Sequence, residues 1–135
     1  MNQAANNPAS ERPTREQARA RYAWKVVKSQ NEASLKDFAG LCKQTASRIL
    51  NSGLGGALAF SISKKKDDTH RAVLGALAGR LLPLLNGSGD DAKTYLEKLM
   101  SSDAITLRQH TEEALALLVW LARLADGLKV EEGEI

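Results

Sequence analysis

The segment Thr106–Leu128 reads TLRQHTEEALALLVWLARLADGL and decides the fold. From Ala114 to Ala125 it is apolar on almost every side, with Arg123 as its single charged residue. A helix that is apolar all round must be covered by other helices or by lipid. Its uncharged run from Ala114 to Ala122 has 9 residues, fewer than the roughly 18 that a membrane span requires. The segment therefore predicts the buried C-terminal helix of a helical domain, with no membrane partner.

The composition of the whole chain also favours helices. Ala and Leu supply most of the hydrophobic residues, which make up 43% of the sequence, whereas aromatic residues make up 4%. Ala and Leu are strong helix formers, and the aromatic and β-branched residues that favour strands are scarce. The length of 135 residues suffices for one domain with a real core. We expect an all-α fold, a compact single-domain bundle of about six helices around the C-terminal helix.

Polar stretches and helix breakers predict the boundaries of this domain. Residues 1–13 contain two of the three prolines among Asn, Gln and Ser, which is typical of a disordered N-terminal tail. The helical domain then covers 14–128, and 129–135 form an acidic C-terminal tail. The expected helices are 14–29, 34–52, 54–62, 69–82, 90–100 and 106–127.

Individual residues refine these boundaries. Thr14 and Thr106 are each followed three residues later by Gln, the spacing of a capping box. Gly53 is expected to end the second helix in the left-handed conformation. In the fourth helix, the small residues Gly75 and Gly79 predict close packing on the C-terminal helix.

The chain is poor in the residues that catalysis requires. His70 and His110 are predicted to be surface histidines, and Cys42 lies on the apolar face of its helix, where a buried thiol is inert. We therefore expect no catalytic residue, no metal and no cofactor. The single cysteine excludes an internal disulfide, and the polar N-terminus lacks the apolar region of a signal peptide. A reducing cytoplasm is the expected location.

The distribution of charge carries the strongest functional signal. Residues 1–66 hold 12 Lys and Arg against 4 Asp and Glu, a balance of +8, whereas residues 101–135 hold 3 against 7, a balance of −4. Such asymmetry suggests an oriented molecule with a polyanion on one side. The alternative, which charge alone leaves open, is an ordinary solvated surface.

Basic residues in the first half of the chain form a candidate interface. Arg21, Lys25 and Lys28 recur at i, i+4 and i+7, so they share one helix face, with Ala23 and Val27 nearly opposite. Flexible cations in a line suit a phosphate backbone rather than base reading. The six aromatic residues, Trp120 among them, are expected mostly in the core, so base stacking is not expected. Charge alone adds Lys43, Lys65, Lys66 and Arg71 to the candidates.

Three blocks of sequence resemble a known family. They are RYAWKVV at Arg21–Val27, ILNSGL at Ile49–Leu54 continuing through ALAF to Lys64, and the TEEAL and WLAR segments within Thr111–Arg123. In this order they cover most of residues 21–125. The chain thereby resembles the small subunit of the type III-B CRISPR effector, the Cmr complex.

The resemblance implies a small α-helical protein without enzymatic activity. Its copies would stack head to tail into a short filament against the backbone subunits that hold the guide RNA, and would help to line the channel where target RNA pairs with the guide. The implied partners are the backbone and large subunits, copies of itself, and guide and target RNA, with no small-molecule substrate. RNA-contacting roles then pass to Arg21, Lys25, Lys64 and Arg123, which lie in the matching blocks.

Other readings of the sequence remain. A helical protein–protein adaptor could present the same basic face to an acidic partner. A small DNA-binding protein would need a recognition helix with base-reading side chains, and no clear one is visible. Arg123 could also pair with a carboxylate such as Glu113 instead of facing RNA.

Overall fold

The computed structural model describes residues 12–133, with side chains described as far as Lys129. In this part of the chain all regular structure is helical, so the all-α prediction is confirmed. The elements, in chain order, are α2 (Arg15–Lys28), η2 (Glu32–Ser34), α3 (Leu35–Ser63), α4 (Asp68–Leu81), η3 (Leu82–Leu85), α5 (Ala92–Met100) and α6 (Ala104–Gly133). These are five α-helices and two short 3-10 segments within residues 12–133, rather than about six helices.

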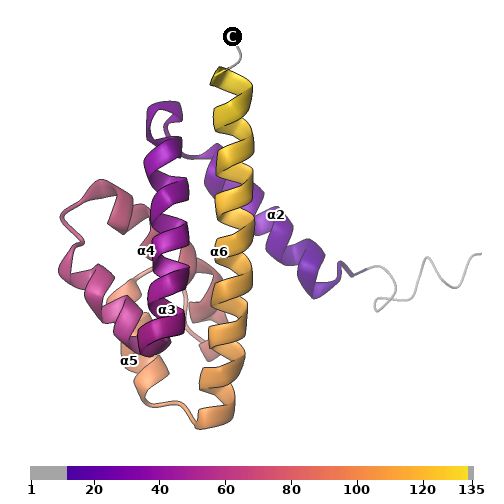
Figure 1. Cartoon of the computed structure of the whole chain (residues 1–135). Helices are drawn as coiled ribbons and strands as arrows, with labels where there is room; N and C mark the ends of the chain where they lie inside the picture. The colour runs from indigo at the N-terminus through magenta and orange to yellow at the C-terminus, as the bar shows by residue number, and fades with distance from the viewer. Residues whose placement is uncertain (1–11, 134–135) are drawn as a thin grey trace, which may run out of the picture.

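The difference in number arises at Gly53. The helices expected at 34–52 and 54–62 are joined without a loop into α3, and Gly53 interrupts it with φ 81° and ψ 163°. The predicted break is confirmed, but this backbone conformation is extended with positive φ, not a left-handed cap, and only glycine adopts it readily. Figure 1 shows the result: the chain turns sharply at the lower end of α3, and the second half leaves in a new direction.

The two long helices form the centre of the fold. α6 and the first half of α3 lie side by side, and α2 crosses behind α6 (Figure 1). One stripe of α6 is buried against these neighbours, including Ala114, Leu117, Leu118 and Leu121. α4 and α5 pack on the other side of α3 and complete the core with residues such as Leu77 and Tyr95.

The prediction that α6 is buried on all sides is wrong. Val119 and Arg123 are exposed on the side away from the core, and Trp120 is only half-buried at the edge of the core. An apolar helix made largely of Ala and Leu thus leaves a narrow uncovered face, because the bundle has too few helices to surround it. No helix of the described residues is long and apolar enough to cross a membrane.

The ends of the helices follow local hydrogen bonding. Thr14 forms the predicted capping box: its hydroxyl accepts from the Gln17 N–H at 3.0 Å, and the Gln17 side chain accepts from the Thr14 N–H at 2.8 Å. The predicted cap at Thr106 is wrong, because α6 begins at Ala104 and Asp103 Oδ1 accepts from the Thr106 N–H at 2.7 Å. At its other end, α6 continues past Gly127 into the acidic segment as far as Gly133. Of the predicted N-terminal tail, residues 1–11 lie outside the described part of the chain.

Of the two glycines of α4 expected to pack on α6, Gly79 packs on Tyr22 of α2 and Gly75 lies beside Asp90. A Cβ atom at Gly79 would lie 2.5 Å from the Tyr22 hydroxyl oxygen. The Tyr22 hydroxyl donates to the Ala76 carbonyl at 2.6 Å. Glycine at 79 therefore makes room for the tyrosine that ties α2 to α4.

Candidate nucleic-acid interface

The predicted basic stripe of α2 faces solvent. Arg21, Lys25 and Lys28 are exposed, whereas Ala23 and Val27 are buried against the core. The alternation follows from the helical period, which places the two sets on opposite sides of α2. The three cations are therefore presented on a helix whose other face is fixed.

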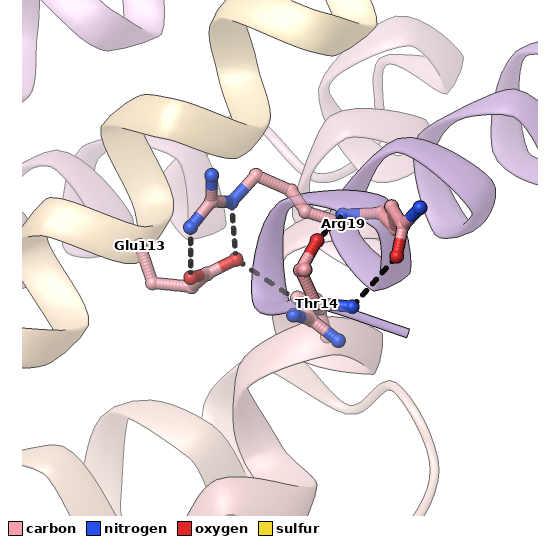
Figure 2. A network of polar contacts seen from close by, with 5 residues as sticks. Thr14, Arg19 and Glu113 are labelled. Carbon is pink, nitrogen blue, oxygen red and sulfur yellow. Dashed lines mark hydrogen bonds and ion pairs between the residues drawn. The ribbon is translucent and has the colours of Figure 1, made fainter. Parts of the chain in front are cut away.

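A network of one buried carboxylate and two partly buried arginines holds α2 in this position. Arg19 donates from Nε and Nη2 to the two carboxylate oxygens of Glu113, each at 2.8 Å, and Arg80 Nε donates to Oε2 at 3.2 Å. Figure 2 shows the paired contact between Arg19 and Glu113 beside the Thr14 cap. Because the three residues come from α2, α4 and α6, the network joins three helices at one point.

The protonation state of Glu113 follows from this network. Burial acts to raise the pKa of Glu113, but the hydrogen bonds and charges of Arg19 and Arg80 outweigh it and hold the pKa below its ordinary value. The hydrogen bond to Glu113 in turn raises the pKa of Arg19. Glu113 and Arg19 are thus charged at neutral pH, and the carboxylate of Glu113 binds two arginines.

This network bears on the predicted Arg123–Glu113 ion pair. Glu113 binds Arg19 and Arg80, so the predicted alternative of an Arg123–Glu113 pair is wrong. Arg123 is exposed on the outer face of α6 and has no ion-pair partner among the described residues.

A second basic group surrounds the turn between α3 and α4. Lys64, Lys65 and Lys66 are exposed there, and Asp67 caps α4 by accepting from the His70 N–H at 3.0 Å. Arg71 forms an ion pair with Asp68 and donates from Nη1 to the Lys65 carbonyl at 3.1 Å. Arg71 therefore braces the turn, which reduces its availability for an external anion.

A surface groove lies between α2 and α4. It has a volume of about 610 Å³, and its lining includes Ser29 and Gln30 at the end of α2 and Arg71 near the start of α4. Of the nine predicted basic residues, only Arg71 lines this groove. Lys43 lies elsewhere, on α3, where its Nζ is 2.8 Å from Asp126 Oδ2 of α6. Lys43 and Arg123 therefore sit near the α3–α6 face and not on the groove.

Most of the six aromatic residues are expected in the core, and two of them, Trp24 and Phe60, are exposed. Trp24 is 45% exposed beside Lys28, whose Nζ lies 5.5 Å from the indole centroid. Phe60 is 39% exposed, with Arg48 Cζ 3.8 Å from its ring centroid. The helical period contained this signal for Phe60, because residues 54, 58 and 61 define the buried face and residue 60 lies off it.

The histidine prediction is wrong at position 110. His110 is buried, and its Nδ1 lies 2.6 Å from the Tyr95 hydroxyl oxygen. Burial lowers the pKa of His110, partly opposed by the charge of Glu113, which favours the neutral ring in this hydrogen bond. Cys42 is buried as predicted, and burial raises its pKa to about 12. No cluster of three or more His, Cys, Asp or Glu side chains suited to a metal occurs among the residues that the structure describes.

Comparison with known proteins adds to this geometry. Residues 15–128 match the family described as CRISPR-associated protein (Cas_Cmr5). Among solved structures, the chain is similar to a CRISPR-associated Cmr5 family protein from Thermus thermophilus, with a TM-score of 0.64 and 25% sequence identity. That alignment covers 86% of this chain and 98% of the other. The family match spans both basic groups and the network that positions α2.

Proposed function

The chain belongs to the Cmr5 family of CRISPR-associated proteins, and from this premise we propose that it acts as a non-catalytic structural subunit of the type III-B effector complex in the cytoplasm. In this role it stacks with copies of itself into a short filament. Its basic face contacts the sugar–phosphate backbone of guide and target RNA, whatever their sequence.

The observation that carries the RNA contact is the number of cations without an internal partner. All nine predicted basic residues are exposed, but only Lys43 and Arg71 have a carboxylate within 4.0 Å in the described part of the chain. Free cations on a fixed scaffold bind phosphates and release counterions, so such binding weakens as salt rises.

Exposed apolar residues support the stacking of copies. Leu50, Met100 and Ile105 are 73%, 69% and 66% exposed. They belong to the end of the first half of α3 and to the α5–α6 turn, which Figure 1 places at the same lower end of the molecule. A second copy of the chain that covers this end would remove apolar surface from water.

The RNA contact is tested with a double charge reversal, Lys25→Glu with Lys64→Glu. We expect it to abolish binding of single-stranded RNA at low salt, because it removes one cation from each basic group and adds two repulsive charges. A matched control is Lys93→Glu with Lys98→Glu, which makes the same charge change on α5. Equal loss in both variants would show that only net charge matters and would contradict the proposed face.

The assembly is tested by affinity purification of the tagged chain from its native host. We expect guide RNA and several CRISPR subunits to be recovered with it. Recovery of one acidic protein without RNA would replace the proposal with the adaptor function.

A further inference from the structure

We propose that Phe60, Arg48 and Lys64 form a binding site for one unpaired nucleotide of the RNA. The base would stack on the exposed aromatic ring, and the adjoining phosphate would bind the two cations. This inference rests on the proposed RNA contact and deepens it, since it adds a contact to a base where the basic face otherwise offers only contacts to phosphates.

The ring of Phe60 is a fixed platform. Its neighbours Ala57, Leu58 and Ser61 are buried, so the second half of α3 is anchored while the ring remains 39% exposed. His70 lies beside it, with the ring centroids 6.3 Å apart and the ring planes at 58°. Base–aromatic stacking accepts every base, because each base has a π face.

Two cations from different segments converge on this ring. Arg48 Cζ lies 3.8 Å and Lys64 Nζ 5.7 Å from the Phe60 centroid. Arg48 is twelve residues before Phe60, a separation of about 18 Å along a straight helix. The bend at Gly53 brings the two side chains together.

Arg48 has an unusual electrostatic environment. Its Nη1 is buried and makes no hydrogen bond to the described residues, and no carboxylate among them lies within 4.0 Å. A partly buried guanidinium without an anion is costly. A phosphate bound beside the ring would offset this cost, since guanidinium matches phosphate oxygens in geometry and charge.

The surface next to the ring has room for the continuing chain. A hollow of about 800 Å³ is lined by residues 62–67 and His70. Asp67 is the carboxylate of this lining, and its Oδ2 is occupied by the backbone N–H of His70. The hollow therefore presents mainly three lysines to the nucleotides that flank the stacked base.

Trp24 is the other exposed aromatic residue, and it is a weaker candidate. Lys28 approaches it from the same helix, with Nζ 5.5 Å from the centroid, and no cation from another segment lies over its ring in the described residues. Phe60 in contrast has cations from two segments. Trp24 is therefore the matched control position.

The test compares two fluorescent ligands of equal charge on the purified full chain: a ten-residue oligouridine and the corresponding abasic ribose–phosphate chain. Phe60→Leu should weaken oligouridine binding about tenfold, within the range of one base–aromatic stack, and leave the abasic ligand unchanged. Phe60→Tyr retains an aromatic ring and should stay within about twofold of the parent protein. Trp24→Leu should leave the affinity for both ligands unchanged.

Other outcomes overturn the inference in distinguishable ways. If Phe60→Leu binds oligouridine like the parent while the Lys25/Lys64 reversal abolishes binding, the stacking site is wrong and the proposed function stands. If Phe60→Leu weakens the binding of oligouridine and of the abasic chain equally, the site recognises charge alone. The same conclusion follows if Phe60→Leu also weakens the binding of a third ligand, a ten-residue polyglutamate. A loss at Trp24→Leu instead would move the stacked base to α2. If the parent binds neither ligand, the RNA contact and the stacking site are both wrong.

Discussion

At the scale of single residues, Glu113 has more influence on the interface than its position suggests. Glu113 contacts no proposed ligand. Its carboxylate binds Arg19 of α2, and this contact holds α2 in its position against α6. The network contains two arginines and one glutamate, so removal of the glutamate leaves two like charges close together with little solvent. A buried pair that loses one partner destabilises a protein much more than the pair itself stabilises it.

Glu113→Gln should lower the free energy of unfolding at pH 7 by about 3 kcal/mol. The folded-state pKa of Glu113 is depressed, so its contribution is fully present above the unfolded pKa of about 4.3 and is lost as pH falls through the folded value. Urea unfolding measured between pH 7 and pH 3 checks this. The parent should lose stability below about pH 4.3, and the variant should lose less over the same window; parallel curves would contradict the assignment.

The buried Tyr95–His110 pair gives a separate pH window. Burial depresses the folded-state pKa of His110, so its contribution is present above the unfolded pKa of about 6.5 and declines as pH falls through the lower folded value. Tyr95→Phe should lower the free energy of unfolding by about 1–3 kcal/mol, because Nδ1 of the buried ring loses its hydrogen-bond partner. An NMR titration of the His110 ring protons should give a midpoint below 6.5 in the parent; a midpoint at or above that value would refute a neutral buried ring.

Among the helices, the bend in α3 determines which side chains meet on the surface, because it brings Arg48 and Phe60 together. The sequence predicts a break at Gly53. Glycine is required there by the backbone angles, φ 81° and ψ 163°. It is not required by lack of space, because a Cβ atom at this position would meet nothing within 4 Å. The break was therefore predictable from residue type, but the direction of the second half was not. That direction depends on how the two apolar faces of α3 reach the same core.

Gly53→Ala should destabilise the protein by about 1–3 kcal/mol, the cost of a non-glycine residue in this backbone region. Gly127→Ala is the matched control, because its Cβ also meets nothing within 4 Å and its backbone is helical. In the control, the free energy of unfolding should rise by up to about 1 kcal/mol, because alanine is favoured over glycine within a helix. Thermal unfolding of both variants checks the pair, and similar melting temperatures would show that Gly53 is not strained. A change in this bend would also separate Arg48 from Phe60, so RNA affinity should fall in Gly53→Ala and not in Gly127→Ala.

The same bend explains which site residues could be predicted. The stripe Arg21, Lys25 and Lys28 follows from the helical period within one element, and its exposure is confirmed. The Arg48–Phe60 pair spans two segments whose relative direction is set by tertiary packing, so no spacing rule within a helix predicts it. The buried position of His110 is not predictable for a related reason: its partner Tyr95 comes from α5, and only the fold places the two together.

At the scale of the whole molecule, the charge asymmetry of the sequence does not become two separate charged ends. α6 lies along α2 and α3, so acidic residues of the last third neighbour basic residues of the first half. Arg19 pairs with Glu113, and Lys43 pairs with Asp126. Part of the charge asymmetry is therefore neutralised by ion pairs within the molecule. Less opposite charge remains to attract one copy of the chain to another than the sequence alone implies.

The exposed apolar end then becomes the better candidate for contact between copies, and salt separates the two mechanisms. Stacking through Leu50, Met100 and Ile105 should persist or strengthen in molar sulfate, which favours apolar burial. Stacking through charges, like RNA binding, should weaken as salt rises. Sedimentation velocity across a concentration series checks this, with Ile105→Asp as the variant that should reduce self-association while RNA binding is unchanged. If self-association disappears in sulfate and Ile105→Asp has no effect on it, the copies associate through charged residues and not through the apolar end.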